Sequence, residues 1–197
     1  MALIKLNINT DKNNKLLEFV YLLEKWNKTY NITAIRDLEK MVILHVIDSA
    51  SVYRHLPENS IIDVGTGGGI PGIIFAILNP QLKVTLLDCN QKKTRFLRFA
   101  QRELNIDNIT VVCDRVEEYK PKILYDVVIS RAFSEVGDFL RLAGHLCKDQ
   151  GQVLAMKGPR IESEENVREI GFELSQDIDI QVPFLEAKRR LLIFNKI

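Results

Sequence analysis

The residues whose types and spacing are best suited to chemistry lie in one glycine-rich segment. It runs from Asp63 to Gly72 with the sequence DVGTGGGIPG, after an apolar run and before a helical pattern. Glycine allows a backbone to turn sharply or to approach a ligand closely. Peptide N–H groups at the start of a helix bind polar or anionic groups. The segment therefore predicts a cofactor-binding turn between a strand and a helix; the alternative is a turn made only for tight packing.

Two cofactors match this turn. Gly67, Gly69 and Gly72 satisfy the GxGxxG pattern of dinucleotide-binding proteins. Gly65, Gly67 and Gly69, with Asp63 two residues earlier, satisfy the DxGxGxG pattern of methyltransferases that use S-adenosylmethionine. The Asp63 carboxylate favours the second reading, because the amino-acid end of S-adenosylmethionine carries an ammonium group.

Further candidate cofactor contacts follow the next two predicted strands. Asp88 ends the first of these, where a carboxylate can accept hydrogen bonds from both ribose hydroxyls. Because both cofactors contain that ribose, Asp88 does not discriminate between them. Val116 and Glu117 follow the third strand, at the expected position of the adenine ring. A solvated loop is the alternative for these two residues.

The end of the fourth predicted strand, YDVVIS, is where substrate chemistry is expected in this architecture. It carries Ser-Arg-Ala-Phe from Ser130 to Phe133, and lacks both the Asn/Asp-Pro-Pro-aromatic motif of exocyclic amine methylation and a Cys nucleophile after Pro. The absent motifs favour a target with its own lone pair, such as guanine N7, whose methylation needs positioning rather than a general base. Arg131 near that base would bind O6, a phosphate or the cofactor carboxylate, because donation to N7 would block the lone pair. A structural ion pair is the alternative for Arg131.

The elements that must position these residues alternate along the chain. Apolar residues recur every three to four positions over Lys12 to Tyr30, which predicts a helix, and Asp37 could cap a second helix that extends to about Leu56. From Ser60 onward, β-rich runs alternate with helical patterns, which predicts an α/β fold with a mostly parallel sheet. The β-rich runs are IIDVG, KVTLLD, NITVVC, YDVVIS, QVLAMKG, FELSQDIDIQV and RRLLIFNKI, and the helical patterns are Pro71 to Leu78, Gln91 to Leu104 and Glu135 to Leu146. The last two runs lack a helix between them and predict an antiparallel pair at one edge of about seven strands.

Polar residues of the N-terminal helices are expected to have structural roles. Asn27 and Asn31 lie near the end of the first helix, where they favour rigid packing of the chain over contact with RNA. His45 and Asp48 share one face of the second helix and could pair with each other.

Length and composition suit one soluble globular protein: 197 residues, of which 46% are hydrophobic and 27% charged.

The charge is distributed unevenly along the chain. The formal net charge of +1 excludes a generally basic nucleic-acid protein, but it is the sum of strongly basic and strongly acidic segments. Lys83 to Arg102 carries +5, Lys188 to Lys196 carries +4 and Glu162 to Asp179 carries −6. These clusters predict a local RNA surface with an acidic segment kept away from phosphates; solvated faces are the alternative. The predicted RNA contacts are Lys92, Arg95, Arg98, Arg102, Arg189 and Arg190.

Neither metal nor membrane is predicted. The three cysteines are too dispersed for a zinc knuckle, and the three histidines have no metal-ligand spacing. The N-terminus lacks the pattern of a signal peptide, and the most apolar stretch, Ile70 to Leu78, is far shorter than a membrane span. We therefore expect a cytoplasmic protein, without a metal, that acts as a monomer.

Taken together, these motifs resemble the bacterial 16S rRNA guanine-N7 methyltransferase G family, also called glucose-inhibited division protein B. The resemblance runs from about Trp26 to the C-terminus. It is carried by WNKTYNITAIRD, HVIDS, DVGTGGGIPG, LLD, RVEE, SRAF, MKG and VPFLEAKRRLLIF. Two departures from the family are present: Leu44 stands where an Arg is common, and the segment Ala-Lys-Arg-Arg from Ala187 to Arg190 replaces Gly-Glu-Arg-His.

The resemblance implies methyl transfer from S-adenosylmethionine to N7 of a guanosine in a 16S rRNA loop near the decoding centre. The product would be S-adenosylhomocysteine, and the partner would be 16S rRNA or a small-subunit assembly particle. It also implies a Rossmann-like class I methyltransferase fold, with a helical extension over residues 1–56 packed on the sheet and a methyltransferase domain over residues 57–197, in one structural unit.

Carried over by position, the family's cofactor contacts fall on Gly65, Ile70, Asp88, Val116, Glu117 and Arg131. Lys157, at a strand end, is a candidate RNA or substrate contact, and with Arg131 it forms the predicted catalytic pair. Two other functions stay open at this point. One is a nicotinamide-dependent oxidoreductase, which rests on the overlapping GxGxxG pattern but lacks an evident proton donor. The other is a noncatalytic RNA-binding module that kept the fold.

Overall fold

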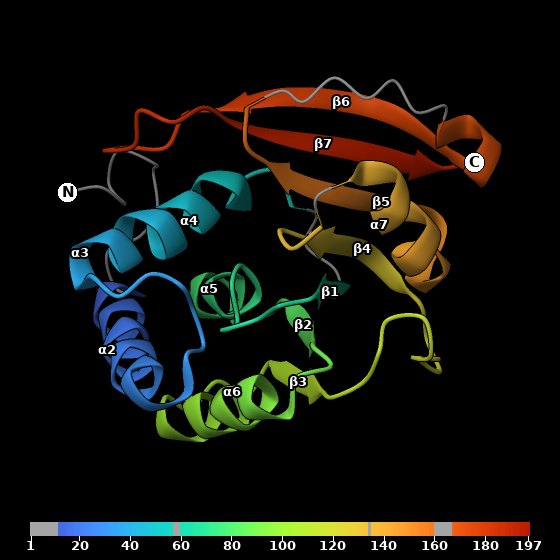
Figure 1. Cartoon of the computed structure of the whole chain (residues 1–197). Coiled ribbons are helices and arrows are strands. Elements are labelled where there is room, and N and C mark those ends of the chain that lie inside the picture. The colour runs from blue at the N-terminus through green and yellow to red at the C-terminus, as the bar shows by residue number, and fades with distance from the viewer. Residues whose placement is uncertain (1–11, 57–59, 134, 160–166) are drawn as a thin grey trace.

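A computed structural model describes residues 12–56, 60–133, 135–159 and 167–197. Its centre is one seven-stranded sheet with the strand order β3-β2-β1-β4-β5-β7-β6 (Figure 1). Strands β1 to β5 are parallel, and β7 is antiparallel to both β5 and β6, as the two closing β-rich runs predicted. The strands are β1 (Ser60–Val64), β2 (Lys83–Leu87), β3 (Ile109–Val112), β4 (Tyr125–Ser130), β5 (Cys147–Lys157), β6 (Phe172–Ile180) and β7 (Arg189–Lys196).

The helices begin and end close to the predicted positions. They are α2 (Asn13–Tyr30), α3 (Leu38–Met41), the π-helix η2 (Val42–Ile47), α4 (Asp48–Tyr53), α5 (Gly72–Leu78), α6 (Gln91–Glu103), α7 (Val136–Ala143) and the 3₁₀-helices η3 (Gly144–Leu146) and η4 (Val167–Ile170). The Asp37 side chain accepts a hydrogen bond from the Lys40 amide, which confirms the predicted cap. Asn90 caps α6 in the same way, through the amides of Lys92 and Lys93.

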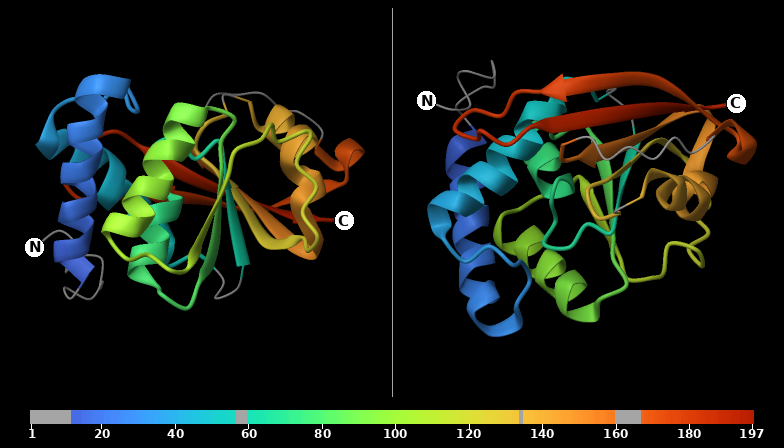
Figure 2. Two further views of the ribbon diagram at one scale, coloured as in Figure 1. Left: turned by 90° about the horizontal axis from the view of Figure 1, so that it is seen from below. Right: turned by 45° about the horizontal axis from the view of Figure 1, so that its top comes forward.

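The sheet divides the hydrophobic core into two clusters, because successive side chains of a strand point to opposite faces. Ile61 belongs to the first cluster with residues of α2, α5 and α6, whereas Ile62 belongs to the second with Phe139 of α7. Figure 2 shows the same division, with α2, α5 and α6 on one side of the sheet and α7 on the other. The sheet therefore presents the ends of β1, β2 and β4 between helices on both faces.

The N-terminal extension shares the first core cluster with the sheet and with the helices that cover it. Helix α2 lies against α5 and α6, the helices that cover the sheet. The centroid of the Trp26 ring lies 5.6 Å from that of Phe96 and 5.1 Å from that of Phe99. The centroids of the Phe19 and Phe96 rings are 6.2 Å apart. The extension thus forms a further helical layer, while its apolar residues join the first core cluster. The boundary expected at residue 57 lies outside the described residues.

The second predicted helix is divided into α3, η2 and α4 and ends at Tyr53, before the expected Leu56. Ser49 and Ser51 donate their hydroxyls to the carbonyl oxygens of His45 and Ile47, four residues earlier. Such bonds compete with regular helical pairing, and π-helical turns occur frequently at functional sites. Within the described ranges, no helix is long and apolar enough to cross a membrane, and no three His, Cys, Asp or Glu side chains are grouped to hold a metal ion.

Candidate active site

The glycine turn follows β1 and adopts a backbone that only glycine tolerates well. Gly65, Gly67 and Gly69 have φ angles of +68°, +60° and +89°. A Cβ on Gly65 would lie 2.9 Å from the Cβ of Ala132, which follows β4. A Cβ on Gly69 would lie 2.6 Å from the Cδ1 of Ile73. The turn therefore brings β1 and β4 too close together for any side chain at Gly65.

Asp63 supports this turn from beneath. Its Oδ2 accepts hydrogen bonds from Thr66 Oγ1 at 2.6 Å and from the Gly72 amide at 2.8 Å. Burial raises the pKa of Asp63 to about 6, although the two hydrogen bonds oppose that shift. The side chain is fully buried and lines no cavity described below. The contact of Asp63 with a cofactor ammonium group stays a prediction. The observed hydrogen bonds show that Asp63 positions the glycine turn.

Asp88 reaches the glycine turn from the neighbouring strand, as the parallel topology requires. Its Oδ2 accepts a hydrogen bond of 2.9 Å from the Gly67 amide, and its Oδ1 accepts one of 2.9 Å from Asn90. Val116 is half-buried against the second core cluster and Glu117 is exposed, both in the segment after β3. The placement of these two residues at an adenine ring stays a prediction.

Arg131, directly after β4, is held by three acceptors from the N-terminal extension. Its NH1 group donates to the Leu44 carbonyl at 2.8 Å and to Asp48 Oδ2 at 3.3 Å, and NH2 lies 3.3 Å from His45 Nδ1. Asp48 is buried, and its Oδ1 accepts a further bond of 3.1 Å from Arg189 Nε. His45 and Asp48, expected to pair with each other, thus both hold Arg131. The structural ion pair left open for Arg131 is present.

His45 connects Arg131 to the loop after α2. Burial first, and then the charge of Arg131, lower the pKa of His45 to about 4, so the ring is neutral near pH 7. Because an arginine only donates hydrogen bonds, Nδ1 must accept from Arg131 and Nε2–H must donate to Thr33 Oγ1 at 3.0 Å. Asn27 fixes the same loop through the Thr33 amide and the Ile35 carbonyl, which confirms its structural role.

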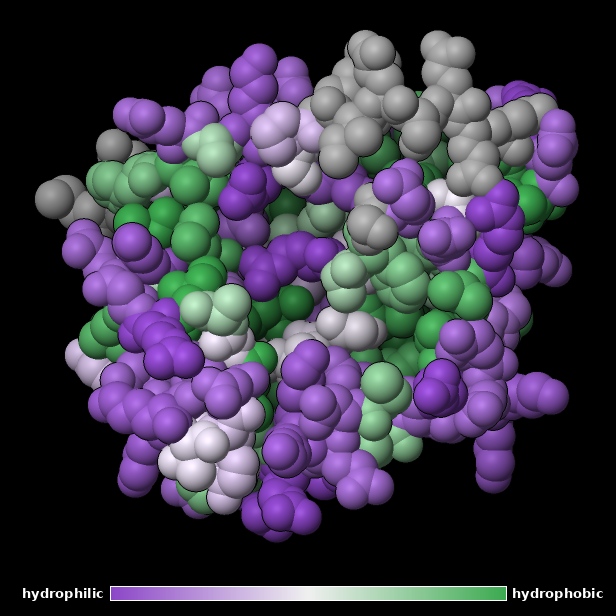
Figure 3. Space-filling model, viewed as in Figure 1, coloured by the Kyte–Doolittle hydropathy of each residue, from purple (hydrophilic) through white to green (hydrophobic). Residues whose placement is uncertain are grey.

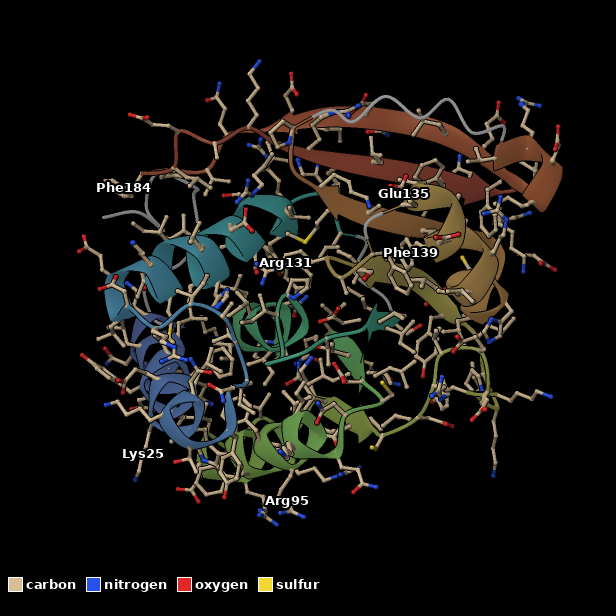
Figure 4. All side chains as sticks on the ribbon, viewed as in Figure 1. Lys25, Arg95, Arg131, Glu135, Phe139 and Phe184 are labelled. Carbon is tan, nitrogen blue, oxygen red and sulfur yellow. The ribbon has the colours of Figure 1, made fainter. Side chains whose placement is uncertain are left out.

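Two cavities meet at Arg131. The turn cavity, about 160 Å³, is lined by Gly65 to Gly68, His45 and Arg131 among others. The Asp48 cavity, about 280 Å³, is lined by Asp48, Arg131, Lys157, Arg189, Arg190 and several apolar side chains. Figure 4 places Arg131 at the centre of this face, and Figure 3 shows strongly hydrophilic side chains in a hollow at the same place. Arg131 is therefore shared between the glycine turn and a second site.

Lys157 and the arginines of β7 also reach the Asp48 cavity. The Lys157 ammonium donates to the Phe133 carbonyl at 2.6 Å, and burial lowers the pKa of Lys157 while Glu135 opposes that shift. The structure therefore brings Lys157 and Arg131, the predicted catalytic pair, to one cavity. Sequence reasoning did not identify Asp48 as a residue of this site, although the spacing in HVIDS placed it on the face of His45.

The acidic and basic segments near the C-terminus lie side by side in β6 and β7, and the separation of the acidic segment from phosphates stays a prediction. These strands pair directly, and Arg190 forms an ion pair with Asp177 of β6. The negative strand thus neutralises part of the C-terminal basic cluster, because strand register places the opposite charges side by side. Arg189 is likewise engaged by Asp48. RNA contact by Arg189 and Arg190 stays a prediction.

The basic face of α6 lies apart from both cavities. Lys92, Arg95, Arg98 and Arg102 are all exposed, whereas Phe96 on the opposite stripe is buried. Figure 4 shows Arg95 directed away from the hollow that contains Arg131. This arrangement suits a contact surface beside the site, and its binding of RNA is likewise still a prediction.

Comparisons with known proteins support both the fold and the family. The family model for rRNA small subunit methyltransferase G matches residues 12–193. The chain is 49% identical over 183 residues to ribosomal RNA small subunit methyltransferase G of Hydrogenovibrio crunogenus, covering 93% of this chain and 85% of that protein. It is 46% identical over 187 residues to the protein of the same name from Methylobacillus flagellatus, covering 95% and 90%.

Solved structures with low sequence identity share the fold. A SAM dependent methyltransferase from Aquifex aeolicus superposes with a TM-score of 0.61 at 13% identity, covering 79% of this chain and 92% of that chain. The mitomycin 7-O-methyltransferase MmcR gives a TM-score of 0.64 at 13% identity, covering 82% and 57%. The predicted class I methyltransferase fold is therefore confirmed. Together with the sequence match over nearly the whole chain, this makes the protein a member of the rRNA small subunit methyltransferase G family.

Proposed function

We propose that this chain transfers the methyl group of S-adenosylmethionine to N7 of a guanosine in 16S rRNA, near the decoding centre. Family and fold make it a methyltransferase that uses S-adenosylmethionine and acts on small-subunit rRNA. The target atom, the position in the rRNA and the roles of individual residues are the proposed part. The nicotinamide-dependent and noncatalytic alternatives are not favoured by the family or by the fold.

The residues around the glycine turn fit S-adenosylmethionine. Gly65 is exposed beside the turn cavity, and its missing Cβ leaves the backbone accessible there. We place Gly65, Gly67, Gly69 and Ile70 at the amino-acid end of the cofactor and Asp88 at the ribose, with Val116 and Glu117 at the adenine. When bound, this cofactor supplies a methyl group on a positively charged sulfur.

The observation that carries the proposal is the position of Arg131 between two cavities. One cavity adjoins the glycine turn, and the other is lined by Asp48 and Lys157. The ionisable side chains there already engage protein partners: Asp48 lies between two arginines, and the Lys157 ammonium donates to a carbonyl. Attack by guanine N7 requires none of them as a base, because its lone pair is free. The site therefore needs only to orient the base and the cofactor.

The partner is small-subunit rRNA, presented either free or in an assembly particle. We also propose that the protein works in the cytoplasm, where that substrate is made in bacteria, and that it acts as a monomer. Sedimentation of the purified chain with and without rRNA measures its oligomeric state.

Tritium transfer tests the proposed function. The purified chain is incubated with labelled S-adenosylmethionine and small subunits, or their 16S rRNA, from cells that lack this modification. We expect label in 16S rRNA, recovery of 7-methylguanosine after digestion, and strand cleavage at one modified guanosine near the decoding centre. Binding of the cofactor without transfer to either substrate would contradict the proposal, and label on an exocyclic amine would contradict the N7 assignment. Calorimetric titration with a nicotinamide cofactor provides the control for the oxidoreductase alternative.

A further inference from the structure

The Asp48 cavity combines a polar wall with apolar walls. Asp48, Arg131 and Arg189 form part of the polar wall, and the apolar side chains are those of Ile35, Leu44, Val52, Met156 and Ile180. Its volume of about 280 Å³ is slightly below the range of ligand pockets, which span roughly 300–1,000 Å³. This combination suits one flat heteroaromatic base, whose faces contact apolar side chains and whose edge forms hydrogen bonds.

Asp48 retains accepting capacity on this wall. A carboxylate has about four lone-pair positions. Among the described residues, its hydrogen bonds come from Arg131 to Oδ2 and from Arg189 to Oδ1. Only 4% of the side chain is exposed, so a group that contacts it does so inside the cavity. Two acceptor positions are thus left for a ligand that carries two adjacent donors.

Arg131 retains donating capacity beside it. A guanidinium has five N–H groups. The bonds within the described part of the chain use NH1 for Leu44 and Asp48 and NH2 for His45. Two N–H groups therefore stay open for an acceptor on a ligand. Because Arg131 lines both cavities, that acceptor lies between Asp48 and the glycine turn.

The order of these groups matches the order of atoms along the edge of guanine. The donors N2–H and N1–H are followed by the acceptor O6 and then by N7. From the Asp48 cavity towards the turn cavity, the protein presents the acceptor Asp48, then the donor Arg131, and then the glycine turn. Adenine reverses the pattern, since its N1 accepts and it has no 2-amino group.

We propose that the Asp48 cavity binds the target guanine, with Asp48 accepting from N1–H and N2–H and Arg131 donating to O6. This rests on the proposed function and adds the residue that selects guanine. Arg131 is occupied by O6, which leaves the N7 lone pair free towards the turn cavity. Asp48 is a specificity-determining residue, because a base that lacks the 2-amino group leaves one of its acceptor positions unpaired inside the cavity.

Inosine provides the test, because it keeps N7, O6 and N1–H and lacks only the 2-amino group. Small subunits are reconstituted with rRNA that carries guanosine or inosine at the methylated position, and kcat/KM for methyl transfer is measured with each. We expect the unaltered protein to prefer guanosine by roughly tenfold or more, as follows from one unpaired buried acceptor. Asp48→Ala removes that acceptor, so the ratio of the two rates should approach one although both rates fall.

Asp126→Asn is the matched control. Asp126 is also a half-buried carboxylate, held by Lys148 and Ser60 at the beginning of β1 and β4, away from the cavity. Its variant should keep the full preference for guanosine. A merely structural role of Asp48 would lower both rates and leave their ratio unchanged.

The outcomes separate the two proposals. No transfer to guanosine by the unaltered protein would overturn the proposed function and this inference together. Transfer to guanosine with equal transfer to inosine would overturn only the inference, and so would an unchanged ratio in Asp48→Ala. If Asp48→Ala does not fold, the preference of the unaltered protein still decides, because a ratio near one contradicts the inference without any variant.

Discussion

At the scale of single residues, Gly65 of the glycine turn and the Asp63 carboxylate have different structural roles. Gly65 is exposed towards the turn cavity and leaves room for Ala132, whereas Asp63 is buried and binds the turn from inside. The glycine pattern predicted the turn correctly, because positive φ angles and missing side chains are properties of the residue itself. The burial of Asp63 depends on the packing around it and was not predictable from its position before the glycines.

Gly65→Ala should abolish high-affinity cofactor binding. The new Cβ would meet Ala132 at 2.9 Å on a backbone with a φ angle of +68°. Calorimetric titration with S-adenosylhomocysteine should show at least a tenfold weaker Kd. The matched control is Gly171→Ala, which places the same residue at a φ of +82°, where the nearest atom is 3.9 Å away and no cofactor contact is proposed. Equal affinities in both variants would contradict the role of Gly65.

Asp63→Asn should change how stability depends on pH. Burial raises the folded-state pKa of Asp63 from 3.8 to about 6. Its contribution to stability is therefore complete below pH 4 and is lost as the pH rises through 6, because folding then buries a charge. Two pKa units correspond to about 3 kcal/mol. The free energy of unfolding of the natural chain, measured relative to Asp63→Asn in urea, should fall by that amount from pH 4 to pH 7.

Asp126→Asn is the control for this pH dependence. Burial alone would raise the pKa of Asp126, but hydrogen bonds from Lys148 and Ser60 together lower it to about 2. Its contribution is therefore lost only as the pH falls towards 2, and this variant should show no such change between pH 4 and pH 7. The same absence of change in Asp63→Asn would show that Asp63 titrates normally.

At the scale of elements, the predicted exposure of basic side chains is confirmed on helix α6 but not on strand β7. The spacing of Lys92, Arg95, Arg98 and Arg102 predicted one exposed face of α6, and the structure confirms this exposure, because helical periodicity is local. The basic residues of β7 were predicted to be available in the same way. Pairing with β6 instead places Asp179 opposite Arg190 and brings Asp177, two residues earlier in β6, into an ion pair with Arg190. Only the sheet register determines these neighbours.

The exposed face of α6 should contribute to RNA affinity but not to cofactor affinity. The double variant Arg95→Glu, Arg102→Glu should weaken binding of 16S rRNA at least tenfold at low salt. The slope of log K against log salt should become shallower by about 0.7–0.9 for each lost phosphate contact. Filter binding over a range of salt measures both effects. Arg141→Glu, an exposed arginine of α7 on the other side of the sheet, is the control and should keep the natural affinity. Identical salt slopes in all three proteins would exclude an RNA contact by α6.

At the scale of the whole molecule, the extension and the sheet share one core. Apolar residues of α2, α5, α6 and the sheet form a single cluster, and α7 packs against the opposite face of the same strands. The network of Arg131 adds a polar connection between β4 and the extension. The extension is therefore part of the cooperative unit that holds the site. Loss of the extension would remove the groups that accept hydrogen bonds from Arg131.

Unfolding in urea should occur in a single transition. Trp26 is the only tryptophan in the chain, so its fluorescence reports on the extension, whereas circular dichroism reports on all helices and strands. The two midpoints should coincide. Phe139→Ala removes a fully buried ring from the second cluster, remote from Trp26, and should lower stability by about 3–5 kcal/mol by both probes. The extension would be an independent unit if the fluorescence transition occurred at a lower urea concentration than the circular dichroism transition. The same conclusion would follow if Phe139→Ala left the fluorescence midpoint unchanged.

The sequence by itself favoured S-adenosylmethionine as the cofactor and predicted the alternation of strands and helices, the antiparallel closing pair and the position of Asp88 at the end of the strand after the glycine turn. These follow from local periodicity, from the conformational freedom of glycine and from the rule that parallel strands end at one edge. Only the tertiary structure decided which charges meet. Asp48 contacts Arg131 across 83 positions and Arg189 across 141. No local sequence pattern predicts contacts between residues so far apart along the chain. These contacts result from the packing of the extension against the rest of the protein and from the pairing of β7 with β5.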